Sequence, residues 1–227
     1  MRTYLARRAL TSCIVLLGVT IITFTLARVV PSNPAVAYIG PRARPEDIER
    51  VERILGLDKP VWVQYGRYLK GLVTGDWGNS IATKQPVLSE IAKRLPATLE
   101  LIVAALLLAT IVGTMLGVIA ALRHGRFADH LIRLLSIGGV SLPTFWLGLL
   151  LQVVFFRHLS LLPPTGRLEP VFEVLTPITR ITGMHTLDSV LTGNWEGLRE
   201  SARHLVLPAV TLAAYPTGVI ARMTRAT

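Results

Sequence analysis

The stretch at residues 75–122, GDWGNSIATKQPVLSEIAKRLPATLELIVAALLLATIVGTMLGVIAAL, decides the fold class. It begins with turn residues and charges, and it then becomes an apolar run in which Glu100 is the last charge. A helix needs about 20 apolar residues to cross a bilayer core of about 30 Å, and residues 101–122 supply them. The stretch therefore predicts a polar helix that feeds directly into a membrane span.

Three further uncharged stretches are long enough, or nearly so, to cross a bilayer: residues 9–27, 134–156 and 205–221. Charged residues make up only 17% of the 227-residue chain, against about 25% in an ordinary soluble domain. We therefore predict an all-α polytopic membrane protein with four spans. Residues 9–27 could instead be a signal peptide, but such a core usually has about 7–15 residues, so we favour an uncleaved anchor.

The excess of basic residues has a topological explanation. A net charge of +10 would suggest nucleic acid as a partner of a soluble protein. Here arginines gather in the N-terminal tail, in the 123–133 connection and at the C-terminus, whereas residues 157–204 carry five basic and five acidic residues. Because short cytoplasmic segments are enriched in Lys and Arg, we predict a cytoplasmic N-terminus, outer segments at 31–95 and 157–204, membrane lipid as a neighbour and no nucleic acid.

The first outer segment reads as short amphipathic helices. Pro45 suits a first helical position and Gly56 suits a helix end. Residues 60–72 and 86–95 show the same apolar periodicity. We expect these helices to lie on the outer membrane surface, with the aromatic side chains at the level of the headgroups; an external helical cap without lipid contact remains the alternative. The aromatic residues in question are Trp62, Tyr65, Tyr68 and Trp77.

The chain is thereby divided into three parts. Residues 1–30 form a cytoplasmic tail and the first span, and residues 31–96 form the external helical segment. Residues 97–227 form the core, with the external loop 157–204. The core helices are expected at about 97–122, 131–156 and 205–222, with Pro96 restarting the helix that enters the second span.

The spans carry few groups that could perform chemistry. No ionisable residue lies near the middle of a span, and Glu100 and Arg28 lie at span ends, where they can reach the headgroups. Neither a P-loop nor the HExxH, CxxC or GxSxG motifs occur. We therefore predict no enzyme, with no catalytic, cofactor-binding or metal residues.

Bent, small-residue helices are the main functional signal in the core. Pro143 removes one helical hydrogen bond and kinks the third span, while Gly113 and Gly117 allow close helix packing. We predict that the third and fourth spans line a solute path, with simple helix packing as the alternative. The candidate path-lining residues are Ser141, Pro143, Thr144, Thr211, Tyr215 and Pro216.

Several segments in a fixed order resemble one family. They are LGLDKPVWVQYGRYLKGLVTGDWGNS, PVLSEIAKRLPATLEL, SLPTFWLGLLL, LLPPTGR, and HLVLPAVTL followed by ARMTRAT. In this order the chain resembles the inner-membrane permease subunit of peptide/nickel ABC importers, of the dipeptide/oligopeptide permease B type. The resemblance implies a type I importer-like helical bundle in a bacterial inner membrane. It also implies a second permease subunit, two cytoplasmic ATPase subunits that hydrolyse ATP, and an external solute-binding protein.

The resemblance also implies a longer chain. The family continues after ARMTRA into a cytoplasmic coupling loop and two more spans, so four of six expected spans are present. We therefore expect a permease truncated before its coupling loop. The alternatives are a truncated permease without function and a non-transporting membrane scaffold or assembly protein.

Overall fold

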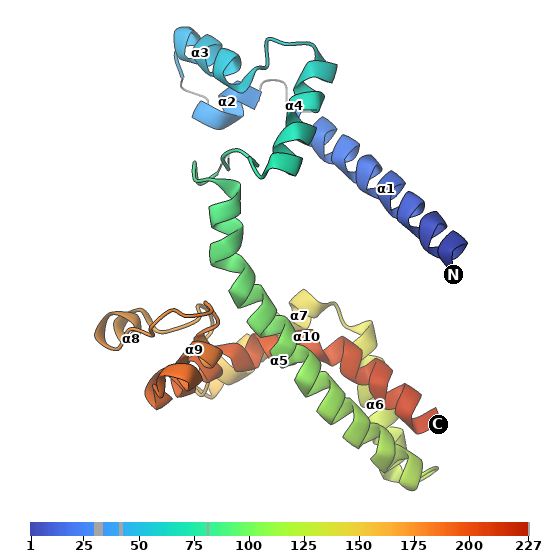
Figure 1. Cartoon of the computed structure of the whole chain (residues 1–227). Helices are drawn as coiled ribbons and strands as arrows, with labels where there is room; N and C mark the ends of the chain where they lie inside the picture. Colours follow the sequence, from blue (N-terminus) through green and yellow to red (C-terminus); the bar gives the residue numbers. More distant parts are fainter. Residues whose placement is uncertain (30–33, 41–42, 81, 227) are drawn as a thin grey trace. The chain divides into compact units, whose positions relative to one another are not determined.

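The computed structural model describes the chain except for residues 30–33, 41–42, 81 and 227. The described residues are largely helical and contain no β-strand, with one isolated bridge between Asn79 and Pro86. They form two compact units, Met1–Ala92 and Lys93–Thr227, which we describe separately (Figure 1). The predicted boundary between residues 30 and 31 lies outside the described residues.

The first unit opens with a long apolar helix. Helix α1 (Arg2–Phe24) continues into a π-helical turn, η1 (Thr25–Val29). Residues 3–28 are long and apolar enough to cross a membrane, and only 6% of their most apolar window is buried inside the chain. Nearly all of this apolar surface is therefore available to lipid or to another protein.

Three short helices follow: α2 (Pro34–Ile39), α3 (Pro45–Leu55) and α4 (Val61–Thr74). The predicted ends of α3 are confirmed. Pro45 occupies the first turn, and Gly56 ends the helix with a φ of 67°, a left-handed conformation that favours glycine.

Aromatic rings join α4 to α1. The Phe24 ring lies edge-on to Tyr65 at 5.3 Å between centroids and 5.7 Å from Tyr68. The Tyr65 hydroxyl is also 2.9 Å from the Thr20 hydroxyl. Two of the four aromatics expected at headgroup level are therefore engaged in packing within the unit, whereas the Trp62 side chain is 76% exposed.

The second unit is built around three long helical segments. Helix α5 (Val87–Leu122) runs without interruption through Pro96, so the prediction that Pro96 restarts the helix is wrong. Proline removes only one hydrogen bond, and here the flanking turns continue the helix. Helix α10 (Trp195–Ala226) is likewise continuous, although it contains Pro208 and Pro216.

The third predicted span is not one kinked helix over 131–156. It consists of α6 (Phe127–Ser141) and α7 (Thr144–Gln152), the latter continuing into the π-helical turn η2 (Val153–His158), and the two parts are bent by 109°. Leu142 at the bend is extended, with φ −77° and ψ 132°. The cause is Pro143, whose ring disfavours the helical region for the residue before it.

Two short helices precede α10: α8 (Pro170–Leu175) and α9 (His185–Thr192). In all, α1, α5 and α10 are long and apolar enough to cross a membrane, and the bent α6–α7 pair makes a fourth crossing if it counts as one span. The all-α, multi-span fold class is thereby confirmed.

Glycines bring α10 into backbone contact with its neighbours on two sides. A Cβ added at Gly117 of α5 would lie 2.8 Å from the carbonyl oxygen of Ala221. A Cβ added at Gly218 of α10 would lie 2.6 Å from the carbonyl oxygen of Ser136 in α6. Real Cβ contacts are longer, so only glycine allows this separation. Figure 1 shows α10 passing α5 and α6 in this unit.

Candidate functional site

Glu100 on α5 is one of three buried carboxylates of the second unit that each accept three hydrogen bonds, together with Asp129 and Asp188. It was expected to reach the headgroups, but its side chain is only 7% exposed and lies among protein partners. Its Oε2 accepts a hydrogen bond from Nη2 of Arg167 at 2.7 Å. Its Oε1 accepts two more, from the backbone N–H and the hydroxyl of Thr186, each at 2.6 Å.

Glu100 acts as a cap for another helix. Thr186 is in the first turn of α9, where backbone N–H groups lack helical partners. A carboxylate at that end is favoured by the hydrogen bond and by the helix dipole. Glu100 thus ties the segment between η2 and α10 to the long helix α5, across 86 residues of sequence.

A second carboxylate, Asp188, holds the loop that precedes α9. It is fully buried and accepts hydrogen bonds from the N–H and hydroxyl of Thr182, at 2.7 and 2.6 Å, and from the N–H of Gly183 at 2.9 Å. Burial raises the pKa of the Asp188 carboxyl, but these hydrogen bonds outweigh it, and the pKa lies below its ordinary value. The ionised form is therefore the one that the loop stabilises.

Arg167 connects the two carboxylate centres. Besides binding Glu100, its Nη2 donates to the Gly183 carbonyl oxygen at 2.9 Å. Gly183 has a φ of 84°, and a Cβ there would lie 3.0 Å from Cγ of Pro96, so the loop lies directly on α5. The sequence offered no local sign of this cluster, which joins residues far apart in the chain.

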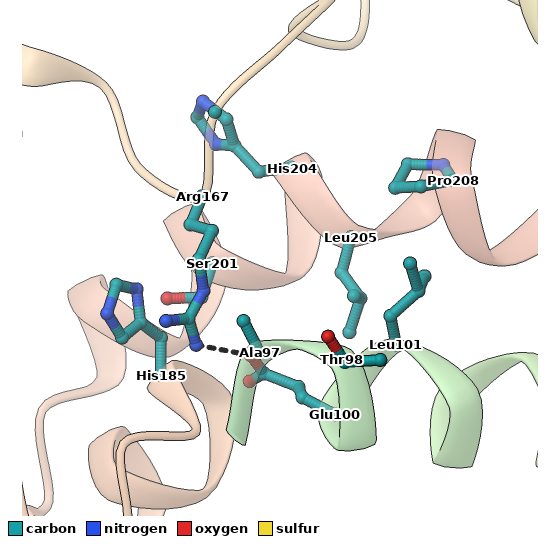
Figure 2. A pocket seen from close by; sticks show the side chains of 11 residues that line it. Ala97, Thr98, Glu100, Leu101, Arg167, His185, Ser201, His204, Leu205 and Pro208 are labelled. Carbon is teal, nitrogen blue, oxygen red and sulfur yellow. Dashed lines mark hydrogen bonds and ion pairs between the residues drawn. The ribbon is translucent and has the colours of Figure 1, made fainter. Parts of the chain in front are cut away.

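A cavity of about 270 Å³ lies beside this cluster. Figure 2 shows its lining, with the dashed line marking the Arg167–Glu100 ion pair. Two buried polar atoms of the lining, Ser201 Oγ and His185 Nδ1, have no hydrogen-bond partner in the described part of the chain. Burial and the charge of Arg167 lower the pKa of His185, so this imidazole is neutral near pH 7. The apolar part of the lining comprises Ala97, Leu101, Leu205 and Pro208.

A second ion pair joins α6 to the last turn of α10. Asp129, whose side chain is 1% exposed, accepts hydrogen bonds from Nε and Nη2 of Arg225 at 2.6 and 2.9 Å. It also accepts the Gly125 N–H at 3.0 Å. Arg225 is therefore held in a bidentate pair, which fixes orientation as well as charge.

The six candidate path-lining residues are divided between two places. Ser141, Pro143 and Thr144 lie at the bend between α6 and α7 and are exposed. Neither the Ser141 nor the Thr144 hydroxyl is hydrogen-bonded to another described residue.

The other three candidates lie along α10. Thr211 donates to the Leu207 carbonyl oxygen at 2.7 Å, and a Cβ at Gly148 of α7 would be 3.3 Å from its methyl group. Tyr215 is 56% exposed, and Pro216 is half-buried. None of the six lines the cavity beside Glu100 or an apolar cavity of about 310 Å³ between α5, α6 and α10.

Comparison with protein families covers nearly the whole chain. Residues 1–102 match the N-terminal model of binding-protein-dependent transport system membrane components. Residues 113–227 match the model described as binding-protein-dependent transport system inner membrane component. The apolar helices and this match together place the chain in a membrane.

Curated proteins with similar sequences are peptide permeases. The chain is 44% identical to the probable D,D-dipeptide transport system permease protein DdpB of Escherichia coli K12, over 93% of the chain and 62% of that protein. It is 40% identical to the dipeptide transport system permease protein DppB of Alkalihalophilus pseudofirmus, over 99% of the chain and 66% of that protein. It is 38% identical to the di/tripeptide transport system permease protein DppB of Pseudomonas aeruginosa, with the same shares. The chain thus spans slightly less than two thirds of the length of these relatives.

Proposed function

Because the chain belongs to the family of binding-protein-dependent transport system inner membrane components, we propose that it serves as the permease subunit of an ATP-driven importer of short peptides. The observation that carries the proposal is the alignment with dipeptide and di/tripeptide permeases over 93–99% of the chain. We favour transport over a scaffold role because the permease relatives match both the external segment and the core of this chain.

The subunit would form half of the membrane path, and its partners would supply the remaining parts. These are a second permease subunit, two cytoplasmic ATPase subunits and an external solute-binding protein. ATP hydrolysis belongs to the ATPase subunits in this proposal, and the permease moves solute by exposing the path to each side in turn. The N-terminus would face the cytoplasm of a bacterial cell, because the arginine-rich tail precedes the first span.

We propose that the bend at Leu142–Pro143 lines the solute path. Interrupted helices are tolerated at membrane depth only where the freed backbone groups are buried in protein or line a water-filled cavity. Ser141 and Thr144 flank this bend with unbonded hydroxyls. On the facing helix, Thr211, Tyr215 and Pro216 complete the proposed lining.

The test is association followed by uptake. The chain is tagged and expressed together with a candidate sister permease, two ATPases and a binding protein, and the purified complex is examined for each partner. Uptake of labelled dialanine is then measured in cells that lack other peptide importers. Absence of the ATPases from the complex, together with no uptake above the empty vector, would refute the proposal.

A further inference from the structure

The cavity beside Glu100 contains hydrogen-bonding groups that the protein does not satisfy. Ser201 is 4% exposed, and its hydroxyl has no partner in the part of the chain that the structure describes. The same holds for Nδ1 of His185. Buried polar atoms without partners are rare because each costs free energy, so a group from outside the chain is expected to bind them.

Arg167 offers further hydrogen-bond donors to this cavity, while Glu100, which also lines it, balances the charge of the guanidinium. Arg167 uses Nη2 for Glu100 and for the Gly183 carbonyl, but a guanidinium has five N–H donors in a fork. Its remaining donors have no partner among the described residues, and they suit a carboxylate, which accepts but does not donate. Metal binding is disfavoured, because the His, Cys, Asp and Glu residues of the described chain do not gather in a group of three.

Part of the remaining lining is apolar, and Thr98, Glu100 and His204 also line the cavity. Ala97, Leu101, Leu205 and Pro208 form the apolar wall, as in ligand sites where a few polar groups fix the orientation of an otherwise apolar surface. Its volume of about 270 Å³ lies just below the range that is usual for ligand pockets, about 300–1,000 Å³. That volume suits one or two small residues.

We propose that this cavity is a solute subsite that binds the C-terminal carboxylate of a short peptide through Arg167 and Ser201, with the adjoining side chain of the peptide against the apolar wall. The inference rests on the proposed function and adds to it a site in this subunit. A phosphate group offers similar oxygens and could come from a lipid headgroup, so the experiment separates the two sources.

Binding is measured on the whole chain in lipid nanodiscs by saturation-transfer NMR. Dialanine, dialanine amide and N-acetylalanine are compared as ligands. We expect dialanine and N-acetylalanine to bind, because both carry the carboxylate, and we expect the amide to bind at least about tenfold more weakly, since hydrogen bonds to charged groups contribute about 1.5–3 kcal/mol.

Two serine variants provide a matched comparison. Ser201→Ala removes a hydroxyl that lines the cavity, and Ser189→Ala removes a buried hydroxyl that also lacks a partner but does not line it. We expect Ser201→Ala to raise the Kd of dialanine about tenfold and Ser189→Ala to leave it unchanged. Because neither hydroxyl is bonded in the structure, neither variant removes a described contact.

Three outcomes overturn the subsite: no binding of dialanine to the unchanged chain, equal binding of dialanine and its amide, or equal effects of the two serine variants. Displacement of dialanine by inorganic phosphate at equal concentration overturns the assignment to a peptide carboxylate. Uptake with an unchanged KM in the Ser201→Ala complex also overturns the subsite, and it leaves the proposed function intact. Failure of the complex to form, together with no uptake above the empty vector, overturns the proposed function whatever the NMR result.

Discussion

Replacing Glu100 by alanine should release α9 from α5. The substitution removes the acceptor of three hydrogen bonds, one from Arg167 and two from Thr186. Hydrogen bonds to charged groups contribute about 1.5–3 kcal/mol each, and removing one partner of a buried ion pair costs about 3–5 kcal/mol. The Arg167 side chain is 34% exposed, so water compensates part of the loss. We expect the docking of α9 to weaken by about 3 kcal/mol.

Hydrogen exchange measured by mass spectrometry on the chain in nanodiscs reports this change directly. A loss of about 3 kcal/mol corresponds to roughly 100-fold faster exchange of the α9 amides, if α9 exchanges by local opening. Glu196→Ala is the matched control, because it removes the same side chain from an exposed position in the first turn of α10. Equal protection of α9 in the unchanged chain and in Glu100→Ala would refute the assignment of Glu100 as its cap.

A double-mutant cycle separates the ion pair from the cap. Arg167→Gln removes the charge partner and leaves the two bonds from Thr186 in place. We expect a coupling free energy of about 1–2 kcal/mol between Glu100→Ala and Arg167→Gln, within the range for residues in contact. A coupling near zero would mean that Glu100 acts through Thr186 alone.

Three further perturbations test other parts of the second unit. Gly117→Ala should lower the free energy of unfolding by about 1–3 kcal/mol through overpacking, as measured by denaturant titration in detergent. Gly138→Ala should leave that free energy unchanged, because nothing lies within 4 Å of its Cβ position. Equal effects of the two variants would contradict the close contact with α10. Asp129→Asn should lower the midpoint of thermal unfolding because it weakens the bidentate pair with Arg225, and a variant as stable as the unchanged chain would argue against that pair. The stability that Asp188 contributes should be present above its unfolded-state pKa of about 3.9 and should be lost as the pH falls through its lower folded-state pKa. In Asp188→Asn, the midpoint of thermal unfolding should therefore fall less steeply with pH on the acid side. An unchanged slope would contradict this.

Helix ends and apolar spans could be predicted because their causes are local. Pro45 and Gly56 mark the two ends of α3 through their own backbone preferences. The apolar run after Glu100 identifies α5 through its length alone. In each case the information lies within one turn or one continuous stretch, so no knowledge of the tertiary structure is needed.

The polar cluster could not be predicted because its causes are remote in sequence. Glu100 has no basic residue three or four positions away on α5, so a headgroup location was the simplest expectation. Its partners Arg167 and Thr186 lie 67 and 86 residues later. One signal was available: an acid at the start of a span, without a local partner, has to find one elsewhere or remain in water.

The bend at Pro143 is also larger than the kink that the sequence predicts. A proline within a helix predicts a kink, and α10 and α5 show that a helix can continue through one. At Leu142 the backbone instead leaves the helical region altogether. A proline disfavours the helical region for the residue before it, but α5 and α10 show that this preference is not always followed, so the proline alone does not predict which result occurs.

The glycine contacts on two sides of α10 restrict how this helix can move. A turn about its own axis would move Gly218 away from the Ser136 carbonyl oxygen and bring Cβ-bearing residues of α10 against the α6 backbone. If α10 tilts together with α5 and α6, both contacts are preserved. We therefore expect the three helices to move as one rigid unit. The helical hydrogen-bond ladder between α6 and α7 is interrupted at Leu142, so we expect any change of angle between these two helices to occur there.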